Sequence, residues 1–185
     1  MRGAGPWTCC SCTGACSGRS DGPPTPVAPA AYLRVVDKGD VAPDFELPDE
    51  TGAVRRLSDL LAGGPVVLFF YPAAMTKGCT QESCHFRDLA GEFADAGAQR
   101  VGISADTVEK QHQFSTRHSL GYPLLSDPDR RVAEEFGVKR SFSMLPNRRA
   151  TFVIDVDRTV LEVVRSEINM NAHADKALAA LHRRS

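Results

Sequence analysis

The fold is decided by residues 63–84, which read GGPVVLFFYPAAMTKGCTQESC. The apolar run Val66–Phe70 lies between Gly63-Gly64-Pro65 and Pro72, and such a run is typical of a central strand buried on both faces. Pro72 has no backbone N–H to donate and should end this strand. A helix should begin near Thr76 to Gly78, with Thr76 as its cap. The stretch therefore predicts a strand, a short loop and a helix with Cys79 in its first turn.

The rest of the chain alternates between strand and helix patterns. Strands are predicted at 99–104, 122–125, 151–154 and 160–165, the last two forming a hairpin. Helices are predicted from about 76 to a stop at Gly97, at 108–118, at 129–136, and at the C-terminus around Ala174, Ala177, Leu178 and Leu181. This alternation predicts an α/β fold in which a central mixed β-sheet carries helices on both faces.

The composition limits the classes of protein to which the chain can belong. Of its 185 residues, 42% are hydrophobic and 24% are charged, which is typical of a soluble globular domain. The formal net charge of −1 argues against nucleic acid or an anionic membrane surface as a partner. No apolar stretch has the length needed to span a bilayer.

The cysteines fall into two groups. Four of the six stand in the first sixteen residues, at Cys9, Cys10, Cys12 and Cys16. The body holds only Cys79 and Cys84, which suit a redox pair better than the disulfide framework of a secreted domain. The first residues lack the apolar core of a signal peptide, so a cytoplasmic location is expected.

Residues 1–34 differ in composition from the body. They are rich in Gly, Pro, Ser and Ala and poor in branched aliphatic residues, so they should not bury enough surface to fold. We expect a disordered N-terminal extension or a translation-start artefact, followed by a single domain over 35–185. The cysteine cluster of the extension lacks the paired C-x-x-C spacing of a zinc site, and no metal is expected.

Cys79 is the candidate nucleophile. At a helix start its sulfur meets unpaired backbone N–H groups and the positive end of the helix dipole, and Lys77 adds positive charge. These positive charges and donors favour the reactive thiolate, whereas a free cysteine has a pKa of ~8.5. A buried inert cysteine is the alternative, and position alone leaves both open.

Cys84 follows five residues later. In an intact helix this spacing corresponds to a rise of ~7.5 Å and a rotation of about 140°. A disulfide needs Cα atoms within ~7 Å and converging side chains. The two cysteines can therefore pair only if the helix start unwinds, and the alternative is that Cys84 is a small core residue.

Several motifs resemble one known family. The pattern Pro72-x-x-x-Thr76-x-x-Cys79 resembles the peroxiredoxin signature, and Thr80-x-Glu82-x-Cys84 resembles the bacterioferritin comigratory protein, or peroxiredoxin Q, branch. The segments 39–47, 122–127 and 149–155, which read GDVAPDFEL, YPLLSD and RATFVID, are also similar to this family. The resemblance extends from about residue 38 to the C-terminus.

The resemblance implies a thioredoxin-like fold and a role for each matching residue. Cys79 would be the peroxidatic cysteine and Cys84 the resolving one. Thr76 would hydrogen-bond to the sulfur and the peroxide, Pro72 would shield them from water, and Arg149 would supply positive charge. Lys77 departs from the proline that is usual in this branch, and Ala73-Ala74-Met75 is less polar than usual.

The implied activity is that of an antioxidant, thiol-dependent peroxidase. It would reduce hydrogen peroxide and organic hydroperoxides through a Cys79 sulfenic acid and an intramolecular disulfide with Cys84. Thioredoxin or a similar dithiol would recycle it, no cofactor would be needed, and a monomer or weak dimer is expected. A disulfide reductase would normally carry C-x-x-C, so the main alternative is a redox-switched binding protein or holdase on the same fold.

Overall fold

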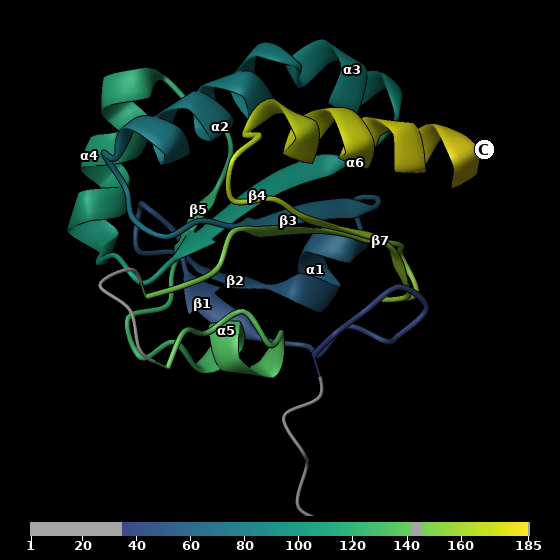
Figure 1. Ribbon diagram of the computed structural model, residues 1–185, viewed down its shortest axis with the longest axis horizontal. Coiled ribbons are helices and arrows are strands. Elements are labelled where there is room, and N and C mark those ends of the chain that lie inside the picture. The colour runs from purple at the N-terminus through teal and green to yellow at the C-terminus, as the bar shows by residue number, and fades with distance from the viewer. Residues whose placement is uncertain (1–34, 142–145, 185) are drawn as a thin grey trace, which may run out of the picture. The chain divides into compact units, whose positions relative to one another are not determined.

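The computed structural model describes residues 35–141 and 146–184. The extension predicted over residues 1–34, with its four cysteines, lies outside the described residues. The described part forms the predicted central mixed sheet with helices on both faces (Figure 1).

The central sheet has five strands in the order β5-β4-β3-β6-β7. Their bounds are β3 Val66–Phe70, β4 Gln99–Ser104, β5 Leu124–Ser126, β6 Ala150–Ile154 and β7 Val160–Arg165. Strand β3 pairs in parallel with β4 and antiparallel with β6, while β6 and β7 form the predicted hairpin. The chain segment 63–84 therefore supplies the middle strand of the sheet, β3.

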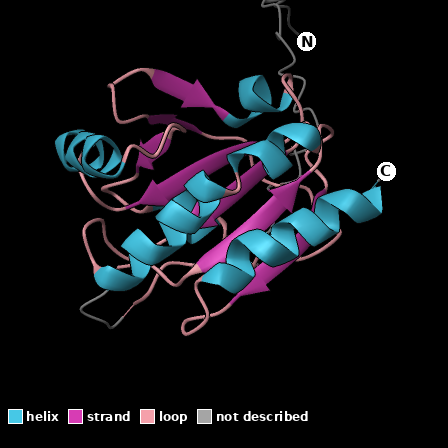
Figure 2. Ribbon diagram, turned by 90° about the horizontal axis from the view of Figure 1, so that it is seen from above, coloured by secondary structure: helices cyan, strands magenta, loops and turns pink. Residues whose placement is uncertain are grey.

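The helices lie in two layers. On one face are α2 (Lys77–Asp88), α3 (Ala90–Asp95), α4 (Val108–His118) and α6 (Asn171–Arg184). On the other are α1 (Leu57–Leu61), α5 (Arg131–Glu135) and a two-stranded ribbon of β1 (Glu46–Pro48) and β2 (Val54–Arg56). Figure 2 shows α6, which ends at the label C, lying beside the α2–α3 segment across the sheet.

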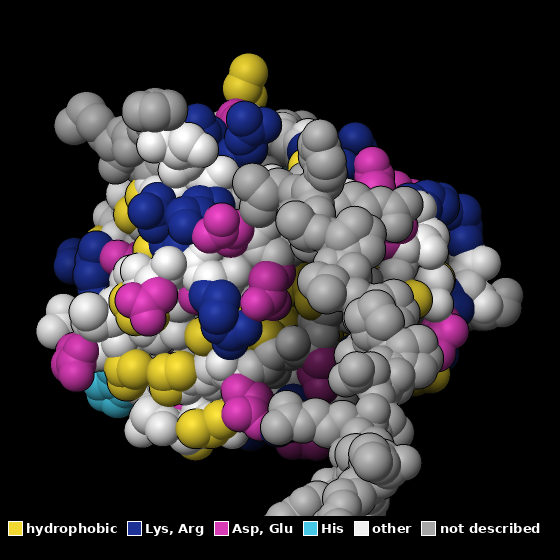
Figure 3. Space-filling model, turned by 90° about the horizontal axis from the view of Figure 1, so that it is seen from below, with side chains coloured by type: hydrophobic (Ala, Val, Ile, Leu, Met, Phe, Trp, Pro, Cys, Tyr) yellow, Lys and Arg dark blue, Asp and Glu magenta, His cyan; other side chains and the backbone are white. Residues whose placement is uncertain are grey.

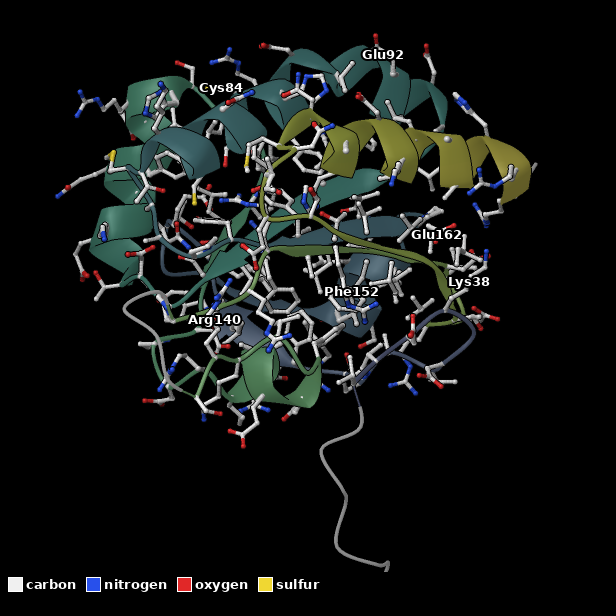
Figure 4. The ribbon with its side chains drawn as sticks, in the orientation of Figure 1. Lys38, Cys84, Glu92, Arg140, Phe152 and Glu162 are labelled. Carbon is white, nitrogen blue, oxygen red and sulfur yellow. The ribbon has the colours of Figure 1, made fainter. Side chains whose placement is uncertain are left out.

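Strand β3 divides the core into two clusters because its side chains alternate between the faces. Val66, Leu68 and Phe70 pack with α1 and α5, whereas Val67 and Phe69 pack with the larger helix layer. Phe152 of β6 lies on the α5 side of the sheet, as Figure 4 shows, with its ring 5.0 Å from that of Phe136. All five residues of β3 are fully buried, as the apolar run predicts.

The structure corrects the predicted helix that ran from about 76 to Gly97. The helix breaks at Leu89, whose backbone leaves helical geometry with φ −90° and ψ 24°, and it continues as α3. The break brings Phe86 and Phe93 together on the core, with ring centroids 5.8 Å apart. The elements β1, β2 and α1 were not predicted, because their segments are too short for a clear period.

The surface carries charges of both signs. Figure 3 shows Lys and Arg side chains interspersed with Asp and Glu over the visible face, as expected for a net charge of −1. Among the residues that the structure describes, no helix is long and apolar enough to cross a membrane.

The buried carboxylate of Asp127 fastens the start of α5, and its removal should destabilise the fold. Asp127 accepts from the backbone N–H groups of Ala133 at 2.9 Å and Val132 at 3.4 Å. Both amides would lose this partner in Asp127→Ala, so we expect a loss of about 1–2 kcal/mol in the free energy of unfolding. Urea unfolding would measure it. The exposed Asp129→Ala is the control, and equal losses in both variants would contradict the assignment.

Candidate active site

Cys79 lies in the first turn of α2, two residues after the helix begins at Lys77. The side chain is buried, with 1% exposure, and the sulfur is a free thiol. Helix geometry leaves the first amides of α2 without intrahelical acceptors, so they can face a developing negative charge. The predicted strand–loop–helix arrangement around Cys79 is therefore present.

The loop between β3 and α2 is held from the neighbouring strand. Asp106, just beyond β4, accepts from the Ala74 N–H at 2.7 Å and from the Ser104 hydroxyl at 2.7 Å. Met75 adopts φ 67°, a left-handed conformation that is uncommon outside glycine and that turns the chain sharply into α2. Asp106 thus helps to fix the position of the start of α2 and of Cys79.

Thr76 and Pro72 lie on either end of this loop. Thr76 occupies the N-cap position of α2, but its hydroxyl donates to the Ala73 carbonyl at 3.0 Å instead of accepting from a helix amide. The predicted position of Thr76 as the cap residue is confirmed, but its side chain makes no capping bond, since the hydroxyl closes the loop. Pro72 is buried two residues after β3 ends at Phe70, where its missing N–H is compatible with the end of the strand.

Arg149 brings positive charge to the sulfur. Its Nη2 donates to Cys79 Sγ at 3.3 Å and its Nη1 donates to Glu82 Oε2, with the arginine only 5% exposed. Burial lowers the pKa of Arg149, but the Glu82 carboxyl and the Cys79 sulfur more than offset this and raise it. The neighbouring Arg148 has an exposed side chain, unlike Arg149. Arg149 therefore sits as a charged donor between two buried acidic groups.

Glu82 and His173 complete a buried polar cluster behind Cys79. Glu82 is fully buried on α2, and burial raises its pKa to about 8 despite the Arg149 guanidinium that opposes the shift. His173 on α6 is also fully buried, and burial lowers its pKa. Its Nδ1 lies 3.7 Å from Glu82 Oε1. The cluster thus joins residues of α2 and α6 with Arg149, which lies just before β6.

Cys84 lies on the same helix as Cys79 but outside this cluster. Figure 4 shows it on α2, on the side of the sheet that also carries α3, α4 and α6. It is half-buried against the core cluster that contains Phe69 and Phe86. Because α2 is intact from Lys77 to Asp88, the two free cysteines are not paired in this structure.

The sequence patterns did not assign roles to Glu82 or His173. Glu82 appears in the motif around Cys84, but nothing in the sequence shows that it meets Arg149. A signal for His173 exists, because it falls on the apolar stripe of α6 with Ala174, Ala177 and Leu181. A histidine in such a stripe is most simply a satisfied core residue, so the stripe alone assigns no chemistry.

The cluster suits nucleophilic chemistry at sulfur. A buried thiol beside a guanidinium and a helix start is stabilised as its anion, and the same donors can stabilise charge leaving a bond that the sulfur attacks. No group of ligating side chains that could hold a metal ion is found within 35–141 and 146–184.

Comparison with known proteins gives one consistent family. The AhpC/TSA family matches residues 38–163. A crystal structure of peroxidoxin BcpB from Mycobacterium tuberculosis superposes with a TM-score of 0.78 at 60% identity, covering 80% of this chain and 98% of that one.

Two further relatives identify the branch. The chloroplastic peroxiredoxin Q of Gentiana triflora is 38% identical over 160 residues, 86% of this chain and 73% of that protein. The bacterioferritin comigratory protein of Xanthomonas campestris, described for its alkyl peroxide reduction activity, has 32% identity, a TM-score of 0.70 and coverage of 76% and 91%. The chain therefore belongs to the AhpC/TSA family and is a thiol peroxidase with a thioredoxin-like fold, of the peroxiredoxin Q or bacterioferritin comigratory protein branch.

Proposed function

We propose that Cys79 is the peroxidatic cysteine and that Arg149 is its principal electrostatic partner. The contact between Arg149 Nη2 and Cys79 Sγ, 3.3 Å long and shielded from water, carries this proposal. A cation in contact with a buried sulfur favours the thiolate, and the thiolate is the nucleophile in thiol chemistry. Hydrogen peroxide and organic hydroperoxides are the proposed substrates.

The first step breaks the peroxide bond. The Cys79 thiolate attacks one oxygen of the peroxide, the O–O bond breaks, and the other oxygen leaves with a proton as water or an alcohol. Arg149 and the free amides at the start of α2 stabilise the negative charge that develops on the leaving oxygen. Thr76, at the N-cap, is proposed to position the peroxide, and Pro72 to keep bulk water from the sulfur.

The second step resolves the sulfenic acid. The Cys84 thiol attacks Cys79, a disulfide forms and water is released. Thioredoxin or a similar dithiol then reduces the disulfide by exchange and returns both thiols. We place this activity in residues 35–185, acting as a monomer or weak dimer.

The exchange of Cys79 for serine tests the nucleophile. In Cys79→Ser, peroxide consumption should fall to the background rate, because a serine hydroxyl is not ionised at neutral pH. In Cys84→Ser, about one equivalent of peroxide should react per chain, but turnover with thioredoxin should stop. A coupled peroxidase assay distinguishes these cases. Near wild-type turnover in Cys79→Ser would exclude the mechanism.

The two adjacent arginines provide a matched pair. Arg149→Ala should slow the reaction of Cys79 with peroxide by roughly a hundredfold, because one preorganised donor to the developing charge is lost. Arg148→Ala, at an exposed site, should react like the wild type. Rates of sulfenic acid formation would measure both, and thermal unfolding would check that each variant is folded. Equal losses would show that the chosen arginine is wrong.

Oxidation should loosen the start of α2, because Cys79 and Cys84 cannot pair within a regular helix. The Thr80 N–H bond to the Thr76 carbonyl, 2.8 Å long, must break with the rest of the first turn. Amide hydrogen exchange across about residues 80–84 should therefore be faster in the oxidised protein than in the reduced one.

The exchange experiment has an internal control and a clear contrary result. Cys79→Ser treated with peroxide should show no increase, since it cannot form the disulfide. Beyond Cys84 the helix should stay protected, because the Arg100 guanidinium donates to the Phe86 carbonyl at 2.8 Å. Mass spectrometry that finds a disulfide between two chains, or Cys84 still free, would overturn the intramolecular cycle.

A further inference from the structure

One oxygen of the buried Glu82 carboxyl has no hydrogen-bond partner. Oε2 accepts from Arg149 Nη1, whereas Oε1 is buried and unpaired among the residues that the structure describes. The nearest ionisable side-chain nitrogen from α6 is His173 Nδ1, at 3.7 Å. An unpaired carboxylate oxygen in a buried site is costly, and a proton on that oxygen lowers the cost because it removes the charge.

The protonation of His173 follows from its other nitrogen. Nε2 lies 2.9 Å from the Ser166 carbonyl, which can only accept, so Nε2 carries a hydrogen. In the neutral ring, Nδ1 then has a lone pair. This lone pair faces the Thr151 hydroxyl at 2.9 Å and Glu82 Oε1 at 3.7 Å. His173 Nδ1 is thus an acceptor: the Thr151 hydroxyl donates to it in this structure, and a proton on Glu82 Oε1, 3.7 Å away, would be a second donor next to it.

Charge balance favours a proton at Oε1. The Cys79 thiolate, the Arg149 guanidinium and an ionised Glu82 would together leave one uncompensated negative charge in a buried site. The other charged groups facing His173 are Glu167, which precedes α6, and Lys176 on α6, and both side chains are exposed. Their charges are therefore screened by water and cannot replace a proton within the cluster.

We propose that Glu82 holds a proton on Oε1 while Cys79 is a thiolate, and that His173 is the positioning residue that keeps it there. A neutral Glu82 still accepts from Arg149 through Oε2, but it no longer cancels the charge of Arg149. The guanidinium then acts on the sulfur alone. This inference rests on the proposed role of Cys79 and deepens it.

The ionisation tendencies of the pair agree with this arrangement. Burial raises the pKa of Glu82 to about 8, and burial lowers the pKa of His173. Near neutral pH the shared proton therefore resides on the carboxyl and the imidazole stays neutral. As pH rises through the pKa of Glu82, its carboxylate forms and competes with Cys79 for Arg149.

The protonated carboxyl can be observed directly. Infrared spectra of the reduced wild type at neutral pH should contain the carbonyl stretch of a buried carboxylic acid, and this band should be missing in Glu82→Gln. In His173→Gln an amide N–H can donate to an ionised Oε1, so the band should vanish at lower pH than in the wild type. Its absence from the wild type at neutral pH would overturn the proposal.

Kinetics test whether the proton matters for the reaction. Glu82→Gln mimics the neutral carboxyl but cannot ionise, so its rate with hydrogen peroxide should lack the fall between about pH 6 and about pH 8 that Glu82 ionisation causes in the wild type. His173→Gln should be roughly fivefold slower near about pH 8 and equal to the wild type near about pH 6, if the pKa of Glu82 falls by about one unit. His85→Gln, which changes another histidine of the α2–α6 contact, is the control and should have no effect.

A double variant separates positioning from structure. In the Glu82→Gln background, His173→Gln should cause no further loss of rate, because the carboxyl proton that His173 keeps in place is absent. A loss of the same factor at every pH, or in that background too, would mean that His173 is only structural and would refute the proposal. A loss of activity in Glu82→Gln comparable to that in Cys79→Ser would refute it as well.

A second variant covers the case in which His173→Gln does not fold. Thr151→Val removes the competing hydroxyl at nearly constant volume and leaves Nδ1 to Glu82 alone. The infrared band should then persist to higher pH than in the wild type, and an unchanged or lower pH would count against the proposal. The infrared result does not require peroxidase activity, so it can fail while Cys79→Ser still establishes the proposed function.

Discussion

The contact between Arg149 and Cys79 is the interaction on which the rest of the site depends. Arg149 directly precedes β6, and Cys79 follows β3, the antiparallel neighbour of β6 in the sheet. The register that pairs Phe70 with Ala150 therefore brings the arginine to the helix start. Both side chains are buried, so the interaction is little screened by water, and a shift of either element would leave a buried charge unpaired.

A buried charge is costly without partners, and this cost explains the composition of the cluster. Arg149 alone would be costly to bury, but sulfur and Glu82 accept from two of its nitrogens. Glu82 is in turn next to His173, which the Ser166 carbonyl and Thr151 hold in place. Each polar group is thus partly satisfied by the next, as far as the loop before α6, while Arg149 Nε and Glu82 Oε1 have no partner among the described residues.

The sequence predicts local features better than contacts between distant segments. The apolar run at 66–70, the loop at Pro72 and the helix containing Cys79 are local, and the structure confirms them. The break at Leu89 accompanies the packing of Phe86 against Phe93, and the helical spacing of the apolar residues does not show where a helix is interrupted. The pairing of Glu82 with Arg149, and of His173 with Glu82, joins residues far apart in the chain, and only the folded sheet brings them together.

The two ends of α2 are held by different kinds of interaction, and this difference suits a helix that the proposed disulfide would open at one end. Its second half is fixed by stacking of Phe86 on Phe69 at 4.3 Å, and by bonds from Arg100 to the Phe86 carbonyl and from Tyr122 to the Ser83 carbonyl. Its first half is held by polar contacts: Cys79 and Glu82 accept from the buried Arg149, and the exposed Gln81 meets Asn171 of α6 at 3.3 Å. Oxidation of Cys79 removes the negative sulfur that Arg149 contacts, so the first turn loses part of its support while the aromatic packing of the second half is unchanged.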